Sequence, residues 1–426
     1  MKIEKEQIIK VIDFWQKAAK KDYLREREIL EEINFKSKEI IDLVGPRRSG
    51  KSSILKLIIK RLNLSNDFLY INFEDPFFIE NNNPAIIEEL ILIFKEYFNP
   101  RLSHIFFDEM QEIKQWEKAL RKLRDGGDYK IFITGSSSKL LSGEIATLIT
   151  GRHLSYKIFP LSFREFLLFK DIRIEGGRDI IVKEKALNKK FDEYLKMGGF
   201  PEIVLENNIE LLKNYFFDIL QKDIMARHEI RDKSILEKMA VYLLSNAAKT
   251  VSLESIKKTY GISFASASVY LEYLKEAMLI FDLPQFSYSL KKQAKTLKKI
   301  YAVDTGLANN VSFRFSEDRG RILENAIFLE LKIKERWNEL YYYKTKNNLE
   351  VDFLVKEKSK PKQLIQAAWT LADKKTKERE IKSLLAAMDE LKLKEGLILT
   401  RDEEAEIKTK NKIIVVKPVW KWILEN

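Results

Sequence analysis

An eight-residue loop, "GPRRSGKS" at residues 45–52, constrains this sequence more than any other feature. It follows a short apolar run, "EIIDLV", and precedes a helix-forming run, "SILKLIIKRL". Placed between a strand and a helix, the pattern G-x-x-x-x-G-K-S turns backbone N–H groups toward an anion at a helix N-terminus, where the helix dipole also favours negative charge. In such a loop Lys51 reaches the β- and γ-phosphates of a nucleotide and Ser52 binds Mg²⁺. The sequence therefore predicts a phosphate-binding loop.

A pair of acids follows a second apolar run. In "HIFFDEMQ" the run ends at Asp108 and Glu109. We expect Asp108 to hold Mg²⁺ through Ser52 and water, and Glu109 to polarise the attacking water. A strand-end turn would also place two acids here, but its coincidence with the phosphate loop favours hydrolysis of the nucleotide over simple storage.

The next apolar run, "KIFITGSS", brings polar residues to the same edge of the expected sheet. Thr134 and Ser136 would face the γ-phosphate, with Ser136 as its sensor, although either could be an ordinary loop cap. Arg152, in "TGRHL", is a candidate arginine finger acting in cis or in trans, and a surface arginine is its alternative. The guanine-reading pattern N-K-x-D is absent, because "NKKF" ends in Phe191, so the predicted base is adenine.

Short apolar runs alternate with helical patterns from about residue 38 to 137. Continuous apolar strands separated by helices indicate a parallel sheet covered on both faces. The predicted fold class is therefore α/β, a P-loop NTPase sheet.

Five segments together resemble prokaryotic, largely archaeal, AAA+ ATPases that carry a C-terminal restriction-nuclease-like domain. They are "GPRRSGKSS", "FFDEMQEIKQWEKALRKL", "ITGSSSKLLSGEIATLITGRHLSYKIFPLSFREF", "GGFPE" and "YAVDTGLANN". The resemblance covers nearly the whole chain. It implies that nucleotide binding and hydrolysis involve Asp108, Glu109, Ser136, Arg152 and the loop residues Gly45, Pro46, Arg47, Arg48, Ser49, Gly50, Lys51, Ser52 and Ser53.

The expected organisation has five parts. They are N-terminal helices (1–35), an AAA+ P-loop core of the ASCE class (36–160), a helical lid (161–235), a winged helix (236–300) and a restriction-endonuclease-like α/β domain (301–426). In the winged-helix part, "SFASASVYLEYLKEA" offers few cations, whereas "SLKKQAKTLKKIY" would form a basic wing. We expect that wing to contact nucleic acid, DNA in the first place, through Lys291, Lys292, Lys295, Lys298 and Lys299, unless the winged helix docks protein instead.

The C-terminal part resembles the PD-(D/E)xK nuclease core in its order of elements. That chemistry needs a helix acid, a strand-end Asp and an E-x-K pair around a metal ion that activates water. Glu324 and Asp352 fit the first two positions, but Gln366 replaces the third acid and Ala368 replaces the lysine. The sequence predicts a degenerate site that lacks nuclease activity, with Glu324 and Asp352 retaining at most a weak metal.

Composition bounds the remaining choices. The net charge of +12, with 33% charged residues, fits a nucleic-acid partner but equally a Lys/Glu-rich thermophile surface. Zero cysteines exclude disulfides and thiolate sites, and the scattered His104, His153 and His228 argue against zinc. No apolar run approaches the roughly 18 residues that cross a bilayer, and the charged start is not a signal peptide, so a cytoplasmic protein without membrane partners is expected.

The leading hypothesis is an ATPase that uses ATP and Mg²⁺ to drive a nucleic-acid-associated process. One alternative is a nucleotide-governed signalling switch that holds a protein partner, and another is an ATP-regulated nuclease. A homo-oligomer would follow if Arg152 acts in trans.

Overall fold

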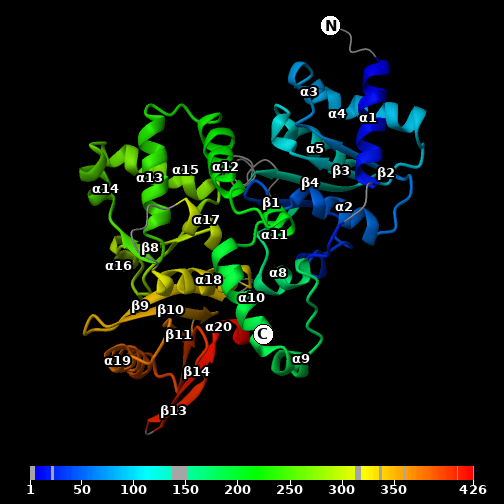
Figure 1. Ribbon diagram of the computed structural model, residues 1–426. Coiled ribbons are helices and arrows are strands. Elements are labelled where there is room, and N and C mark those ends of the chain that lie inside the picture. The colour runs from blue at the N-terminus through cyan, green and yellow to red at the C-terminus, as the bar shows by residue number, and fades with distance from the viewer. Residues whose placement is uncertain are drawn as a thin grey trace. The chain divides into compact units, whose positions relative to one another are not determined.

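A computed structural model describes residues 5–20, 24–136, 151–311, 318–334, 338–358, 360–409 and 411–425. The chain divides into two compact units, Met1–Phe159 with Glu276–Met278, and Pro160–Lys275 with Leu279–Asn426. Figure 1 shows most of the first unit in blue and cyan and the second in green to red. The expected finer division of residues 161–426 into lid, winged helix and C-terminal domain stays a prediction.

Five parallel strands form the sheet of the first unit, in the order β2-β3-β4-β1-β5. They are β1 (Ile40–Gly45), β2 (Phe68–Asn72), β3 (His104–Asp108), β4 (Lys130–Ser136) and β5 (His153–Lys157). The predicted parallel sheet is confirmed, with each of the four expected apolar runs forming a strand. Strand β5 was not expected, because "HLSYK" holds only two apolar residues and lies at the sheet edge beside β1.

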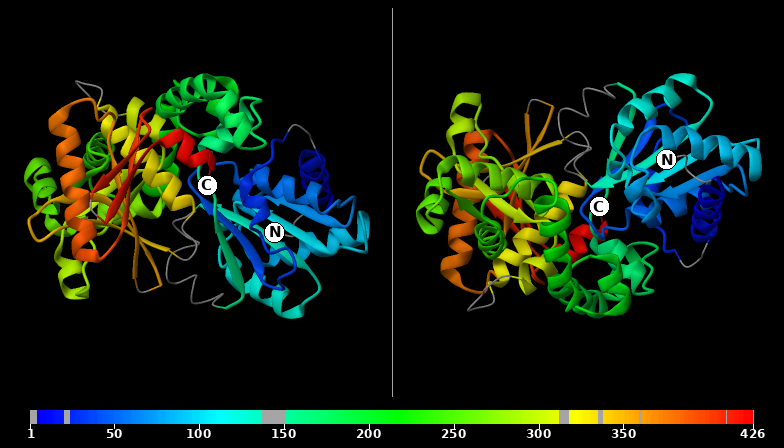
Figure 2. Two further views of the ribbon diagram at one scale, coloured as in Figure 1. Left: turned by 90° about the horizontal axis from the view of Figure 1, so that it is seen from below. Right: turned by 90° about the horizontal axis from the view of Figure 1, so that it is seen from above.

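Helices cover both faces of this sheet (Figure 2). The helical elements are α1 (Lys5–Lys20), η1 (Glu28–Glu31), α2 (Lys51–Arg61), α3 (Phe77–Glu80), α4 (Ala85–Tyr97), η2 (Met110–Glu112) and α5 (Trp116–Gly126). Alternate residues of β1 face opposite ways, so Ile40 and Val44 pack with α1, α4 and α5 while Ile41 and Leu43 pack with α2 and η1. The result is a three-layer α/β sandwich.

The second unit begins with a helical region, as expected. Its helices are α8 (Phe163–Phe169), α9 (Gly177–Val182), α10 (Glu184–Met197), α11 (Pro201–Glu206) and α12 (Leu211–Asp218), and α12 continues into the π-helix η3 (Ile219–Met225). Helix α8 starts at a capping box, in which the Ser162 hydroxyl accepts from Glu165 N–H while the Glu165 carboxylate accepts from Ser162 N–H.

Three helices and a small sheet follow. They are α13 (Lys233–Ser245), α14 (Leu253–Tyr260) and α15 (Phe264–Glu276), with strands β6 (Lys249–Val251), β7 (Ile280–Leu283) and β8 (Lys298–Ala302) paired in the order β6-β8-β7. Between β7 and β8 lies a segment that we call the basic hairpin, residues 284–297, which contains the short helix α16 (Leu290–Lys295). Helix α17 (Thr305–Asn310) then leads to the last part of the chain.

A mixed six-stranded sheet completes the second unit, in the order β13-β14-β12-β11-β10-β9. Its strands are β9 (Asn338–Lys344), β10 (Glu350–Glu357), β11 (Lys360–Ala367), β12 (Glu395–Thr400), β13 (Ala405–Thr409) and β14 (Lys412–Pro418), and its helices are α18 (Arg319–Ile333), α19 (Lys374–Leu391) and α20 (Val419–Glu425). The expected order of a helix, three strands and a long helix is present, and β13 is additional. No helix among the described residues has both the length and the apolar character to cross a membrane.

Candidate functional site

The predicted phosphate loop joins β1 to α2 and has the backbone that its glycines require. Gly50, just before the first turn of α2, has φ 94°, a left-handed conformation that favours glycine. At Gly45 a Cβ atom would lie 2.1 Å from the carbonyl oxygen of Ile158, so any side chain there would collide with backbone. The Ser49 hydroxyl oxygen is buried and has no hydrogen-bond partner among the described residues. The loop therefore offers a helix N-terminus and an unsatisfied polar atom to an anion.

Lys51 lies at the centre of this loop and is 4% exposed. Its Nζ is 3.2 Å from the carbonyl oxygens of Gly45 and Pro46, and 4.0 Å from Glu109 Oε1. The structure thus brings together two residues predicted from separate motifs. The ammonium group is held mainly by carbonyl dipoles, which a phosphate group could replace.

Asp108 ends β3 and is completely buried. Its carboxylate accepts hydrogen bonds from Thr134 Oγ1 at 2.5 Å and from the Tyr70 hydroxyl at 2.9 Å, and it also bonds the Ser52 side chain. Burial, and then the charge of Glu109, raise the pKa of Asp108, while these hydrogen bonds oppose the rise. A carboxylate and a serine hydroxyl in contact are hard oxygen ligands, so the residues fit a hydrated Mg²⁺.

Glu109 has a strained backbone that its surroundings stabilise. Its φ of 52° is left-handed, which is uncommon for a residue with a side chain. Its N–H donates to Thr134 Oγ1 at 2.9 Å, and its Oε2 accepts from the Gln111 amide at 2.5 Å. Two neighbours therefore fix the direction in which this carboxylate points, as a residue that must orient a water molecule requires.

Thr134 does not have the role that we expected. It is completely buried and bonds both Asp108 and the N–H of Glu109, so it supports the acids and does not face a γ-phosphate. Ser136 pairs with Gly45 at the end of β4, which places its backbone beside the loop. The side chain of Ser136 lies outside the described residues, as does the segment 137–150.

Arg152 lies near the amino end of the parallel strands, opposite to the end that carries the phosphate loop. Its carbonyl accepts from the N–H of Ile40, at the start of β1, whereas the loop follows Gly45 at the end of that strand. At about 3.3 Å per residue, five residues separate these two positions by about 16 Å. Its Nε donates to Asp125 Oδ1 at 3.0 Å. The hypothesis of an arginine finger in cis is therefore wrong. The guanidinium lies near the amino end of the strands, whereas the phosphate loop lies at their carboxyl end.

The remaining loop residues differ in surroundings. Arg47 forms an ion pair with Glu74 at 2.9 Å, Arg48 is exposed at a φ of 70°, and Ser53 is exposed on the first turn of α2. Pro46 is buried, and its carbonyl contributes to the lysine site. Pro46 is thus the one of these four residues with a described contact to Lys51.

Sequence reasoning missed Arg27. Its buried guanidinium donates to the carbonyl of Ser49 in the phosphate loop at 3.0 Å and to the carbonyl of Phe159 at 2.9 Å. It therefore joins the phosphate loop to the segment that follows β5. No local pattern could reveal it, because "REREILEE" reads as an exposed charged stretch. Tyr70 and Asn72, which bond Asp108 from β2, were also missed, because no local sequence pattern marks them.

Two family segments without predicted roles meet each other in the second unit. The buried carboxylate of Asp304, in "YAVDTGLANN", accepts from the N–H of Gly199, in "GGFPE", at 2.6 Å and caps α17 through Leu307 N–H. A Cβ at Gly306 would lie 2.1 Å from the carbonyl oxygen of Met197. Burial, opposed by these backbone hydrogen bonds, raises the pKa of Asp304 to about 6. These two segments therefore pack closely against each other.

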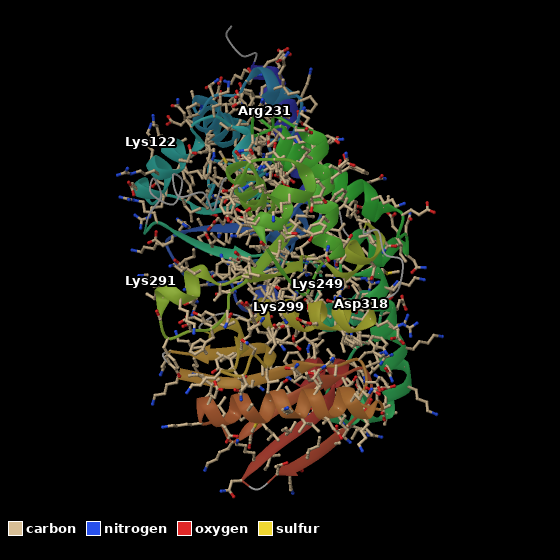
Figure 3. All side chains as sticks on the ribbon, turned by 90° about the vertical axis from the view of Figure 1, so that its left-hand side faces the viewer. Lys122, Arg231, Lys249, Lys291, Lys299 and Asp318 are labelled. Carbon is tan, nitrogen blue, oxygen red and sulfur yellow. The ribbon has the colours of Figure 1, made fainter. Side chains whose placement is uncertain are left out.

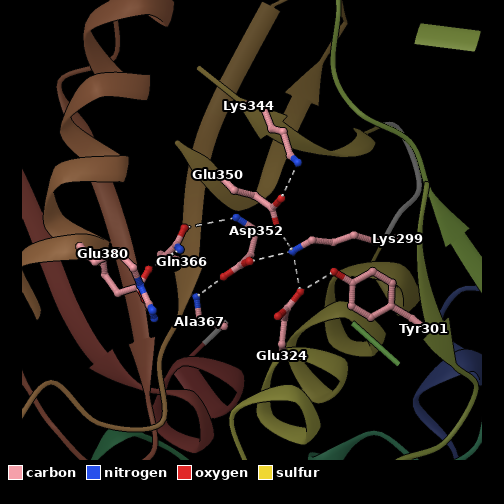
Figure 4. Close-up of polar contacts among 10 residues, drawn as sticks. Lys299, Tyr301, Glu324, Lys344, Glu350, Asp352, Gln366, Ala367 and Glu380 are labelled. Carbon is pink, nitrogen blue, oxygen red and sulfur yellow. Dashed lines mark hydrogen bonds and ion pairs between the residues drawn. The ribbon is translucent and has the colours of Figure 1, made fainter. Parts of the chain in front are cut away.

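The nuclease-like residues also come together, but around a lysine (Figure 4). The Nζ of Lys299 lies 3.0 Å from Glu324 Oε1, 2.8 Å from Glu350 Oε1 and 2.8 Å from Asp352 Oδ1. Gln366 accepts from the Asp352 N–H at 3.2 Å and donates to Glu380. Lys299 was expected in an exposed basic wing, and that prediction is wrong, because the residue is 2% exposed and surrounded by carboxylates.

The other lysines of the expected wing divide into two groups. Lys298 is exposed but forms an ion pair with Asp282 at 2.7 Å. Lys291, Lys292 and Lys295 are exposed on α16 and form no ion pair with any described residue. Figure 3 shows Lys291 on this helix and Lys299 apart from it. Three cations of the expected five therefore remain available on the basic hairpin.

Comparison with known families matches the chain in three consecutive parts. An AAA domain matches residues 37–167, and two domains of unknown function, DUF8612 and DUF4143, match residues 188–318 and 319–422. The AAA match covers the sheet, the phosphate loop and the two acids described above.

Two relatives are uncharacterized proteins. One, from Methanocaldococcus jannaschii, is 39% identical over 95% of this chain and 92% of its own length. Another, from Haemophilus influenzae, is 32% identical over 72% of this chain and 78% of its own length.

Solved structures give only a distant likeness. The Thermotoga maritima RuvB Holliday junction branch migration motor has a TM-score of 0.27 at 14% identity, covering 65% of this chain and 88% of its own. The Aeropyrum pernix ORC1 protein in complex with DNA has a TM-score of 0.29 at 11% identity, covering 72% and 91%. No functional conclusion follows from likeness at this level. The sequence relatives and the AAA match are sufficient to place it: this chain belongs to the family of AAA-domain proteins that includes the Methanocaldococcus jannaschii and Haemophilus influenzae relatives.

Proposed function

We propose that this protein hydrolyses ATP with Mg²⁺ and couples hydrolysis to a nucleic-acid-associated process. The observation that carries the proposal is the convergence of Lys51, Ser52, Asp108 and Glu109 at the carboxyl end of one parallel sheet. In this arrangement Lys51 and the loop N–H groups bind the phosphates, and Ser52 with Asp108 holds Mg²⁺, which neutralises charge on the phosphates when it is bound. Glu109 orients the attacking water and accepts its proton.

A turnover assay with two variants tests the hydrolase. Lys51→Ala removes the phosphate-binding cation, and ATP binding measured by isothermal titration should be lost. Lys60→Ala, an exposed lysine on the same helix, is the matched control and should bind ATP normally. Micromolar ATP binding by Lys51→Ala would overturn the loop assignment.

We assign the nucleic-acid contact to the basic hairpin. Helices α13 to α15 with the sheet β6-β8-β7 have the order of a winged-helix domain, in which the hairpin between β7 and β8 is the wing. Lys291, Lys292 and Lys295 supply unpaired charge for phosphates, whereas α15 carries Glu272 and Glu276. Binding through three lysines predicts a strong dependence on salt and little on base sequence.

The coupling is tested by ATP turnover with and without a mixed-sequence 30-bp DNA duplex. Stimulation by DNA that is lost in the Lys291→Ala, Lys292→Ala, Lys295→Ala triple variant supports the proposal. Equal stimulation of the wild type and the triple variant would overturn the hairpin assignment, and the absence of stimulation would overturn the coupling to DNA.

One observation favours a second candidate, a nucleotide-governed switch that binds a protein. Helix α15 presents a surface on which Phe264 and Val269 are 48% and 43% exposed and which also carries the acids Glu272 and Glu276. Such a face suits a protein partner better than a phosphate backbone. Slow turnover that DNA does not change, with tightly retained nucleotide, would favour the switch.

A role of Arg152 in hydrolysis requires an assembly of subunits. Since it lies about 16 Å along the strands from its own loop, we propose that it completes the site of a neighbouring subunit in trans. Mixing Lys51→Ala with Arg152→Ala should restore turnover, because each variant supplies what the other lacks. A mixture no more active than its two components would contradict the trans role.

The proposed lid, residues 161–235, rests on the helical content of α8 to α12. The proposed restriction-endonuclease-like domain rests on the sequence of α18, β9, β10, β11 and α19. Its resemblance concerns the fold, because the lysine-filled carboxylate cluster gives an ATP-regulated nuclease no support.

A further inference from the structure

The acids of the C-terminal sheet form one buried cluster, which we call the acidic cluster: Glu324 on α18, with Glu350 and Asp352 on β10. Its cations are Lys299, from β8, and Lys344, whose Nζ lies 3.2 Å from Glu350 Oε2. Burial alone would lower the pKa of Lys299, but the charges of Asp352 and Glu324 raise it well above its ordinary value. Lys299 is therefore a permanent cation at the centre of the cluster.

The acidic cluster does not fit the metal that its fold resemblance implies. The ammonium group of Lys299 lies between Glu324 and Asp352, where a nuclease metal would bind both acids. The second oxygen of Asp352 accepts from the N–H of Ala367 at 3.0 Å. Gln366, in place of the third acid, is bonded to Glu380. Among the described parts of the chain, no three acid or histidine side chains are grouped to hold a metal ion.

The strand that supplies Lys299, β8, directly follows the second leg of the basic hairpin. Tyr301, two residues further along β8, donates its hydroxyl hydrogen to Glu324 Oε1 at 2.7 Å. The acidic cluster therefore receives two side chains from one face of β8, as the two-residue period of a strand requires. These contacts fix the end of the hairpin's second leg.

The first leg of the hairpin is held by the C-terminal sheet as well. Phe286 is buried in the core of that sheet with Val351 and Leu354, and its N–H donates to the carbonyl of Tyr342 at 2.7 Å. The Tyr342 hydroxyl donates to the carbonyl of Leu297 at 2.5 Å, at the start of the second leg. Both legs are thus attached to the C-terminal sheet at their base.

The tip beyond this base has a different character. Tyr288 and Leu290 are 78% and 80% exposed, and the unpaired lysines of α16 follow directly. An exposed, cationic tip on a firmly attached base loses less conformational entropy on binding a polyanion than a free loop would.

We infer that the acidic cluster is an intramolecular lock, in which Lys299 takes the place of a divalent metal and the C-terminal domain serves as the scaffold of the basic hairpin. The domain then acts by positioning cations, and Lys299 is a positioning residue. This inference rests on the contacts of the hairpin and holds whether or not the hairpin binds nucleic acid.

Hydrogen exchange of the full-length protein tests the lock without nucleotide or DNA. In Lys299→Met, amides of residues 284–302 should exchange at least ~10-fold faster than in the wild type, while those of β1 and β3 stay unchanged. Lys298→Met is the matched control, because it removes the same charge from the neighbouring position of β8, and it should leave 284–302 protected. If Lys299→Met does not fold, Glu350→Gln removes the charge that pairs with Lys299 and Lys344 on the partly exposed side, and a smaller increase in the same residues is expected.

Three exchange results would overturn the inference. One is unchanged exchange at 284–302 in the folded Lys299→Met protein or, where that variant does not fold, in Glu350→Gln. Another is an equal effect of Lys298→Met. The third is a gain of protection at residues 350–352 when Mn²⁺ is added to the wild-type protein, since that would mark the cluster as a metal site.

A DNA titration connects the lock to binding. Using anisotropy of a fluorescein-labelled 30-bp duplex, Lys299→Met should weaken binding more than Lys298→Met does, although Lys299 is buried and cannot contact DNA. Rescue by Lys299→Arg, which keeps the charge, would separate the lock from simple loss of packing. If Lys298→Met weakens DNA binding as much as Lys299→Met or more, the effect comes from charge alone and the positioning role is overturned.

Discussion

In the first unit Lys51 lies 4.0 Å from Glu109 and is bonded to two carbonyl oxygens, whereas in the second unit Lys299 lies within 3.0 Å of three carboxylates. Both lysines are almost completely buried and lie beside acids. Carbonyl dipoles compensate a buried ammonium only in part, so Lys51 retains a strong attraction for an anionic ligand. The carboxylates around Lys299 neutralise it. The groups that compensate its charge, more than its burial, therefore decide whether such a lysine binds a ligand or stabilises the fold.

The most severe test of this comparison removes the Lys299 ammonium. Loss of one partner from a buried ion-pair cluster leaves unpaired charge and costs about 3–5 kcal/mol. Lys299→Met should lower the free energy of unfolding by this amount, measured by urea denaturation followed through tryptophan fluorescence. Lys298→Met, an exposed pair, should cost no more than about 1 kcal/mol. Similar losses in both variants would mean that the cluster is not a compensated unit.

Neutralising one acid in each unit sharpens the comparison. Glu109→Gln should still bind ATP but lose at least ~100-fold in turnover, because the amide cannot accept a proton from water. Glu112→Gln, an exposed neighbour, and Asp352→Asn should both retain wild-type turnover. Undiminished hydrolysis by Glu109→Gln would assign the water to another residue.

Asp304 extends the comparison to a buried acid that backbone N–H groups hold. Its folded pKa of about 6 lies above the unfolded value of 3.8. The folded protein therefore binds the extra proton, and stability falls as the pH rises from about 4 to about 6. The effect should be on the order of 2 kcal/mol. Asp304→Asn should flatten this part of the curve of unfolding free energy against pH, and an unchanged slope would refute the shift.

The smallest expected effect concerns Arg27, a buried cation that donates to the carbonyl oxygens of Ser49 and Phe159. Its loss frees the Ser49 carbonyl of the phosphate loop, and we expect Arg27→Met to weaken ATP binding about 10-fold, equal to ~1.4 kcal/mol. Isothermal titration with ATP measures this, with Lys60→Ala as the surface control. Unaltered affinity would show that the loop keeps its shape without the bridge.

Local patterns predicted the first unit well. The loop, Asp108 and Glu109 follow apolar strands whose carboxyl ends must meet at one edge of a parallel sheet, so a linear spacing was sufficient to bring them together. Strand β5 and the opposite placement of Arg152 could not be predicted, because they depend on an edge strand with only two apolar residues.

The second unit shows where such reasoning fails. The acids Glu324 and Asp352 were identified from the sequence, as was the replacement of the third acid by Gln366. Their partner Lys299, however, was assigned to a solvent-exposed wing. A strand residue points to one of two faces, and which face is buried here depends on β10, some 50 residues further along the chain. Long-range packing of this kind leaves no signature in a short stretch of lysines.

The position of Lys299 has a further consequence for how the protein responds to its surroundings. A cation attached to the same chain is present at a fixed, very high effective concentration and cannot be removed by a chelator. EDTA should therefore abolish the proposed Mg²⁺-dependent ATP turnover and leave the C-terminal sheet intact. Divalent ions are therefore expected to affect the proposed ATPase site and not the C-terminal sheet.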